Sequence, residues 1–185
     1  MPVDWNKKTV LGTIGYHNLS NHSIAPLLID KIKQLEWAKN VTVEEMNWGP
    51  IAIVQWFQSL ETPFDRVVLF TAIQRPKRKI GDITIFKWGG GIPNDREVQA
   101  RVGDAVTGVI SPENLLIIGE YFKIWPKEVY LVDVEPGPEK AGETLTTKVG
   151  ERVMEYLEML EIVCRQGCKS DENCIILQGD KIAFK

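Results

Sequence analysis

Two histidines are the residues in this sequence best suited to acid–base or metal chemistry. His17 and His22 are its only histidines, and both fall in a polar stretch that follows the apolar run 9–14. Imidazole is the commonest metal ligand and titrates near neutral pH. A His-x4-His pair in a loop can converge on one ion, but a catalytic zinc site needs a third protein ligand. The spacing alone leaves two interpretations open, a metal or acid–base site and ordinary polar loop residues.

Three cysteines, Cys164, Cys168 and Cys174, lie close together near the C-terminus. An odd number of cysteines in a chain whose first residues lack an apolar leader is typical of a reducing compartment, so we expect a cytoplasmic protein. The C-x3-C-x5-C spacing is not a standard zinc or cluster pattern, and a fourth ligand would have to come from elsewhere. We interpret the three as structural or incidental thiols, with a metal or redox role as the alternative.

Other common catalytic motifs are missing from the sequence. It contains neither the G-x-S-x-G of a serine hydrolase nor the G-x-x-x-x-G-K-[ST] of a phosphate-binding loop. The glycines at 89–91 lack the strand–glycine–helix context of a nucleotide site, and we interpret them as a flexible loop. The basic run from Arg75 to Lys79 is interpreted as a solvated turn, with an anion or partner contact as the alternative.

The elements that must position these residues follow from the hydrophobic pattern. Strands are predicted over 9–14, 41–46, 66–73, 82–87 and 128–134. Run 66–73 is almost entirely apolar, which is typical of a parallel strand covered on both faces. Helical spacing predicts helices over 24–35, 51–60 and 145–163, and a further helix beginning at Ser111-Pro112, a good N-terminal signal. We expect a loop from residue 88 to about 108.

This alternation predicts an α/β fold, a three-layer α/β/α sandwich around a mostly parallel five-stranded sheet of the phosphorylase/hydrolase-like type. The end of the chain predicts a two-stranded hairpin around Gly179. We therefore expect a single domain over 1–170 and a C-terminal β-hairpin appendage over 171–185. In such sheets ligands bind beyond the carboxyl ends of the strands. The loops to inspect are 15–23, 46–50, 71–79, 108–114 and 133–143.

Composition and charge exclude several classes of partner. The chain has 185 residues, of which 44% are hydrophobic and 25% charged, as in an ordinary globular protein. Its net charge of −3 argues against a general nucleic-acid binder. Its longest apolar runs are far shorter than the roughly 18 to 20 residues that a membrane span needs. We expect neither a nucleic-acid nor a membrane partner.

Four segments together resemble the hydrogenase maturation endopeptidases, the nickel-dependent proteases that trim the C-terminus of the large subunit of nickel–iron hydrogenases. They are 12–25, 67–73, 109–113 and 125–136. In the first segment, Gly15, Leu19 and Ile24 fit the family pattern of an opening strand and loop. The second is similar to a family strand that ends in a metal-ligating Asp, and the third to a helix start that supplies a ligating His. The likeness covers residues 9–165.

The resemblance implies a metal site at three positions, and all three are substituted in this chain. His22 stands at the family's acidic ligand in the first loop, Thr71 at its strand-end Asp and Glu113 at its helix-start His. His and Glu are thus exchanged between positions, and Thr is a poor ligand for nickel or zinc. A third donor would have to be recruited, for example Glu45, Asp133 or Glu135. We expect weak binding of nickel or zinc, or no metal at all.

Two functions follow from this resemblance. The first is an endopeptidase with rearranged ligands that acts on a protein client, either a hydrogenase large subunit or another metalloenzyme subunit. The second is a non-catalytic binding or assembly module on the same fold, which the exchanged ligands favour, because fold likeness alone does not transfer activity. An unrelated hydrolase built around His22 lacks a Ser or Cys nucleophile motif.

Three further residues are candidates for partner binding. Trp48 precedes Gly49-Pro50 and should lie at the mouth of the sheet beside His22. Tyr16 and Asn21 stand where the family has Asn and Asp in the first loop. Because exposed aromatic side chains are enriched at interfaces, Trp48 is the best of these candidates.

Overall fold

The computed structural model describes residues 6–108, 111–168 and 174–182. In these parts of the chain β-strands alternate with α-helices (α) and short 3-10 helices (η). Their order is β1 (Thr9–Thr13), η1 (Ser20–Ser23), α1 (Ile24–Gln34), β2 (Val41–Glu45), α2 (Pro50–Gln58), β3 (Arg66–Ala72), β4 (Ile83–Trp88), α3 (Asp95–Val106), α4 (Pro112–Tyr121), β5 (Glu128–Val134), α5 (Thr147–Gly150), α6 (Val153–Gln166), β6 (Cys174–Leu177) and η2 (Gly179–Lys181).

The strands form one mixed sheet in the order β2-β1-β3-β5-β4-β6. Neighbouring strands run parallel except β4 and β5, which are antiparallel. The central strands β3 and β5 are buried along almost their whole length, as expected for strands covered on both faces. The edge strand β2 is partly exposed throughout. The mostly parallel sheet is confirmed, but it has six strands in the described residues instead of five.

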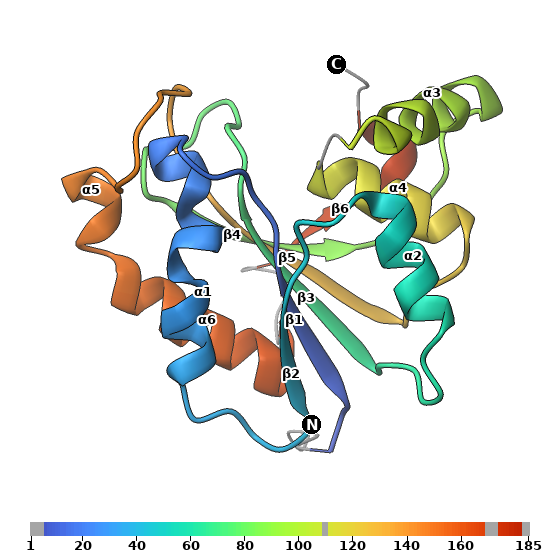
Figure 1. Ribbon diagram of the computed structural model, residues 1–185, viewed down its shortest axis with the longest axis horizontal. Helices are drawn as coiled ribbons and strands as arrows, with labels where there is room; N and C mark the ends of the chain where they lie inside the picture. Colours follow the sequence, from blue (N-terminus) through green and yellow to red (C-terminus); the bar gives the residue numbers. More distant parts are fainter. Residues whose placement is uncertain (1–5, 109–110, 169–173, 183–185) are drawn as a thin grey trace.

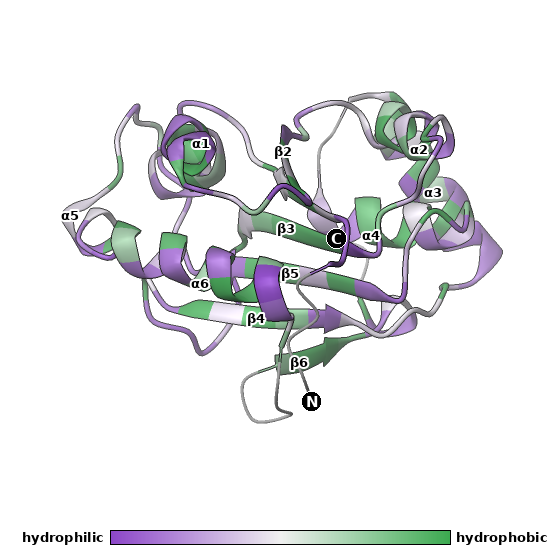
Figure 2. Cartoon of the chain, turned by 90° about the horizontal axis from the view of Figure 1, so that it is seen from below, coloured by the Kyte–Doolittle hydropathy of each residue, from purple (hydrophilic) through white to green (hydrophobic). Residues whose placement is uncertain are grey.

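Helices cover both faces of this sheet (Figure 1). Helices α1, α5 and α6 lie on one side, where they bury a core with Phe70, Val132 and Tyr156. Helices α2, α3 and α4 lie on the other, where Leu69, Leu116 and other apolar residues form a second core. Figure 2 shows the hydrophobic colour concentrated on the strands and on the helix sides that face them. The predicted three-layer sandwich is therefore confirmed.

The expected loop 88–108 is wrong, because most of it is helix α3. The Asn94 side chain caps this helix by accepting a hydrogen bond from the Glu97 N–H at 3.0 Å. Only Val98, Arg101 and Ala105 are buried along the helix. This narrow inward face includes a charged residue, so hydrophobic periodicity alone does not reveal it.

The expected C-terminal hairpin is also wrong for the described residues 174–182. Strand β6 pairs in parallel with β4, and the 3-10 helix η2 follows it. The segment bonds to the chain after β4 instead of to itself: Gly89 N–H donates to Leu177 O at 2.8 Å, and Gly179 N–H to Gly90 O at 3.0 Å. The expected boundary at 170 lies outside the described residues.

The helix predicted over 145–163 is two helices, α5 and α6, separated at Glu151 and Arg152. The Arg152 N–H bonds to the carbonyl of Val149, three residues back, which is a tighter turn than an α-helix makes. Within the described residues, no helix has the length and apolar character required to cross a bilayer.

Candidate functional site

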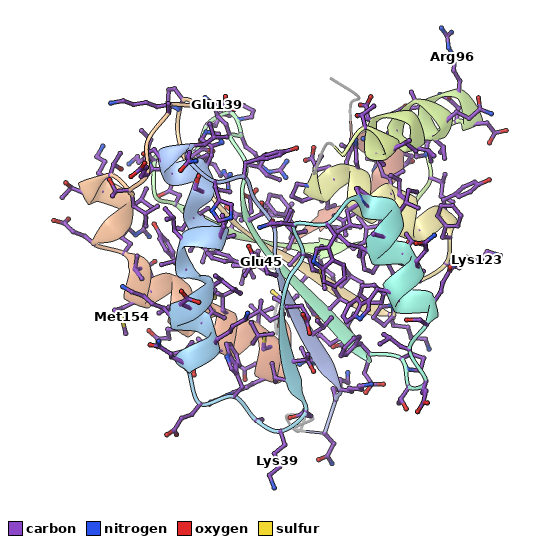
Figure 3. All side chains as sticks on the ribbon, viewed as in Figure 1. Lys39, Glu45, Arg96, Lys123, Glu139 and Met154 are labelled. Atoms are coloured by element: carbon purple, nitrogen blue, oxygen red, sulfur yellow. The ribbon has the colours of Figure 1, made fainter. Side chains whose placement is uncertain are left out.

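A pocket of about 270 Å³ opens where strands β1 and β3 end. The loop after β1, the end of β3 and the start of α4 form its walls, and Glu139 from the chain after β5 adds to its rim. Figure 3 shows Glu139 at this end of the molecule and Lys39, which precedes β2, at the opposite end. The lining residues are Ile14, Gly15, Tyr16, Leu19, His22, Thr71, Ala72, Ile73, Gln74, Ser111, Pro112, Glu113 and Glu139.

The topology of the sheet explains why these segments meet. Strands β1 and β3 are parallel neighbours, with Thr13 opposite Phe70. The Ile14 N–H extends this pairing by donating to Phe70 O at 2.9 Å. The residues that follow the two strands therefore emerge side by side at the carboxyl edge, the usual ligand site of such sheets. The three predicted positions, His22, Thr71 and Glu113, all line the one pocket.

His22 lies in η1, which is held by local hydrogen bonds. The Leu19 N–H donates to Ser23 Oγ at 2.8 Å, and the His22 N–H donates to Leu19 O at 3.1 Å. The His22 side chain is half-buried, and its Nε2 donates to Gly137 O at 2.9 Å. This bond fixes the tautomer with the proton on Nε2 and leaves Nδ1 as the acceptor or ligand atom.

Thr71 and Glu113 reach the pocket from the sheet and from helix α4. Thr71 is near the end of β3 and only 2% exposed. Ser111 caps α4 and Pro112 occupies its first turn, as the sequence predicts. This start places Glu113 in the first helical turn, where a carboxylate interacts favourably with the helix dipole. Glu113 Oε1 also accepts a charged hydrogen bond at 2.8 Å from Arg75 Nη1.

Arg75 and Arg78 form a buried ion network beside the pocket, and sequence reasoning missed both of them. Arg75 Nε donates to Asp133 Oδ2 at 2.7 Å, and the Arg75 backbone N–H donates to Glu135 Oε2 at 2.8 Å. Arg78 contacts the same two carboxylates at 3.3 and 3.1 Å. The expected solvated turn at 75–79 is wrong for these two arginines, whose side chains are only 19% and 13% exposed.

Burial and ion pairing shift the pKa values of Asp133 and Arg75 in opposite directions. Burial raises the pKa of Asp133, and the guanidinium groups of Arg78 and Arg75 act against that rise. Burial lowers the pKa of Arg75, but its contacts with Asp133 and Glu113 outweigh this and leave the pKa above its ordinary value. Arg75 is therefore a cation at neutral pH.

The donor atoms at the three family positions do not fit a three-ligand metal site. His22 can offer only Nδ1, because its Nε2 is bonded to a carbonyl; Thr71 offers a neutral hydroxyl, and one oxygen of Glu113 is paired with Arg75. Throughout the described residues, no three His, Cys, Asp or Glu side chains are grouped so that they could hold a metal. Two of the suggested replacement donors, Asp133 and Glu135, are bound by the arginines.

Glu45 and His17 lie on the far side of the first loop. Glu45 Oε1 accepts from Asn47 Nδ2 at 2.8 Å and lies 3.7 Å from His17 Nε2. Asn47 Oδ1 in turn accepts from the Gly15 N–H at 3.0 Å. Glu45 therefore helps to shape the loop that carries Tyr16, and the two histidines have different partners.

The three candidate partner residues differ in exposure. Tyr16 is 43% exposed at the pocket rim. Trp48 is half-buried and packs edge-to-face on Trp56, with 5.6 Å between ring centroids. Asn21 is buried: its Nδ2 donates to Pro136 O and its Oδ1 accepts from the Thr146 N–H. Asn21 thus ties η1 to the chain after β5, and Tyr16 is the candidate most accessible to a partner.

The three cysteines lie in or against the core that α1 and α6 cover. Cys164 is buried in α6, and burial raises the pKa of its thiol. Cys168 and Cys174 are half-buried and pack against the same core. This placement agrees with the structural interpretation of Cys164.

Neither a protein-family model nor a curated protein matches this sequence. Solved structures do. The hydrogenase maturating endopeptidase HybD from E. coli matches with a TM-score of 0.57 and 22% identity, over 82% of this chain and 88% of that one. The nickel–iron hydrogenase maturation protease HycI from Thermococcus kodakarensis KOD1 matches with a TM-score of 0.57 and 21% identity, over 89% of this chain and 97% of that one. The endopeptidase HycI from Escherichia coli matches with a TM-score of 0.58 and 20% identity, over 86% of this chain and 93% of that one. The chain has the fold of the hydrogenase maturation proteases.

Proposed function

We propose that this chain is a hydrogenase maturation protease-like protein whose pocket receives a segment of a protein client. One observation carries the proposal: His22, Thr71 and Glu113, which lie far apart in the sequence, line the same pocket at the carboxyl edge of the sheet. These are the positions that the family resemblance assigns to the active site. The fold shared with HybD and HycI supports the same assignment.

The proposed client is the large subunit of a nickel–iron hydrogenase or another metalloenzyme subunit, bound near its C-terminus. The names of the structural neighbours, maturating endopeptidase and maturation protease, support a client of this kind. The pocket combines apolar walls, such as Ile14 and Ile73, with polar groups at its rim. Such a lining suits an extended peptide that buries side chains and hydrogen-bonds through its backbone. The proposed setting is the cytoplasm.

A second candidate function is binding without cleavage, as an assembly module. The Arg75–Glu113 ion pair favours it, because the pair engages the only carboxylate among the three family positions. Metal-assisted hydrolysis needs both a retained ion and an open position for water. The chain could therefore bind a client without cleaving it, so binding and cleavage have to be measured separately.

The test uses the full chain and a purified hydrogenase large-subunit precursor that still carries its C-terminal extension. Binding is measured by calorimetry, and cleavage by the mass of the precursor after incubation. Tyr16→Ser should weaken binding about tenfold, since an aromatic contact at an interface contributes on the order of 1–2 kcal/mol. Tyr121→Ser is the matched control, because Tyr121 is similarly exposed but lies outside the pocket.

Equal loss of affinity in both tyrosine variants would contradict the proposed site, and no binding of any precursor would contradict the proposed client class. A precursor shortened at its C-terminus would identify an endopeptidase. A precursor that is bound but keeps its mass would identify the assembly module.

A further inference from the structure

Five charged side chains form a cluster at the carboxyl edge of β3 and β5, next to the pocket. Glu113, Asp133 and Glu135 supply three carboxylates, and Arg75 and Arg78 supply two guanidinium groups. The Asp133 side chain is fully buried and that of Glu135 is 3% exposed. Buried carboxylates require cations or hydrogen-bond donors, because an unpaired charge in the protein interior is costly.

Arg75 is the group that joins the pocket to this buried cluster. Its Nη1 is 2.8 Å from Glu113 Oε1 on α4, and its Nε is 2.7 Å from Asp133 Oδ2 on β5. One planar cation thus holds a carboxylate from a helix and a carboxylate from a strand. A divalent metal ion at this edge would need the same oxygens, at the shorter distance of about 2.0–2.2 Å typical of zinc–carboxylate bonds.

Additional contacts fix the Arg75 side chain in this position. Its guanidinium carbon lies 4.6 Å from the centre of the Phe86 ring, a cation–π contact. Its backbone N–H donates to Glu135, which also accepts from the Gly137 N–H at 3.1 Å. An incoming metal ion would have to displace a cation that is bound by two carboxylates and stacked on an aromatic ring. The guanidinium also keeps its charge at every physiological pH.

We infer that Arg75 takes the place of a metal ion at this edge of the sheet, so that the pocket keeps its shape and charge balance without a divalent cation. The metal that the family resemblance implies does not fit the residues present. The Arg75 guanidinium explains why, because it already binds the carboxylates of Glu113 and Asp133. The inference goes beyond the proposed client binding and does not require it, since metal binding is measured without any client.

The first test measures nickel and zinc binding to the wild-type chain by equilibrium dialysis. The wild-type chain and the variants His22→Ala and Glu113→Gln should retain the same amount of metal. The reason is that neither the His22 nor the Glu113 side chain holds an ion at the pocket. Stoichiometric metal in the wild type that is lost in both variants would overturn the inference.

The second test removes the cation. Arg75→Met should gain about tenfold or more in affinity for Co²⁺ and Zn²⁺, since freed carboxylates become available as ligands. The gain should disappear in the double variant Arg75→Met with Glu113→Gln. Arg75→Lys, which keeps the charge, should bind metal as weakly as the wild type.

Arg78→Met is the matched control for this second test. Arg78 contacts Asp133 and Glu135 but not Glu113, so its loss should produce no Glu113-dependent metal binding. A folded Arg75→Met protein that binds metal no better than wild type would contradict the inference. Circular dichroism checks folding, and if Arg75→Met does not fold, the wild-type comparison with His22→Ala and Glu113→Gln decides the question.

Discussion

Arg66 and Glu128 form an ion pair at the end of the sheet opposite the pocket. They are register partners on β3 and β5, and Arg66 Nη2 lies 2.6 Å from Glu128 Oε2. The Arg66 side chain is only 3% exposed and also donates to the Cys164 carbonyl at 2.8 Å. Lys7 contacts the other Glu128 oxygen. Removing one partner would leave a buried guanidinium without its counter-charge, so the fold depends on the pair staying intact.

Glu128→Gln should lower the free energy of unfolding by about 1–3 kcal/mol at pH 7, the cost of leaving a buried donor without a good acceptor. Burial raises the pKa of Glu128, but the hydrogen bonds from Lys7 and Arg66 outweigh it, so its pKa lies below the ordinary value of 4.5. A depressed carboxyl pKa stabilises the fold above the pKa of the unfolded chain, and this contribution is lost as pH falls through the folded pKa.

The difference between wild type and Glu128→Gln in urea unfolding should therefore shrink as the pH falls below about 4.5. Glu158→Gln, which changes an exposed carboxylate on α6, is the control and should show little difference at any pH. A Glu128→Gln deficit that stays constant from pH 7 to pH 3 would contradict this account of the pair.

At the residue scale, the sequence predicted the pocket positions but not the arginines beside them. His22, Thr71 and Glu113 were found through motif order, which survives substitution of the side chains. Arg75 and Arg78 were missed because a basic run after a strand is usually solvated. The available signal lay in another segment: Asp133 and Glu135 end an apolar strand, and buried acids on a central strand require cations nearby.

At the scale of the element, helix α4 connects the pocket to the core. Its first turn carries Glu113, and further along it Gly119 lies against the indole ring of Trp125. The Trp125 Nε1 also donates to Leu116 O at 2.8 Å. A Cβ atom on Gly119 would lie 2.3 Å from Trp125 Cε2, far inside van der Waals contact. The absence of a side chain at position 119 thus allows Trp125 to pack closely against α4.

Gly119→Ala should destabilise the protein by about 1–3 kcal/mol, because the added methyl group forces the helix or the indole to shift. Gly103→Ala is the matched control in helix α3, where a Cβ would meet no atom within 4 Å. It should be neutral or stabilise by up to about 1 kcal/mol, since Ala favours helix over Gly. Chemical denaturation measures both, and equal effects of the two substitutions would contradict the packing of Trp125 on α4.

Helices and strands with a strong hydrophobic period in the sequence were predictable, and those with a weak hydrophobic period were not. The apolar strands β1, β3 and β5 and the capped start of α4 were all expected from the sequence. Helix α3 was missed because Arg101 occupies its buried face, where it is bonded to Glu97 and Asn114. Strand β6 was taken for half of a hairpin because pairing with β4, which lies far away in the sequence, leaves no local signal.

For the molecule as a whole, the pocket lies at the carboxyl edge of the sheet. The two helix layers cover the faces of the sheet (Figure 1). The chain after β1, the end of β3 and the start of α4 line the pocket at the carboxyl edge. The ion network of Arg75 and Arg78 lies under this edge and holds α4 to β5. The pocket is therefore built from the ends of β3 and α4, which belong to the packed sheet and helix layers, together with the loop after β1.

Hydrogen exchange with and without a bound large-subunit precursor tests this account most directly. Segments 15–22, 71–74 and 111–114 should become protected together, because all three line one pocket. Protection confined to another surface, such as the groove between Phe57 and Phe122, or no change at the three segments despite binding, would contradict it.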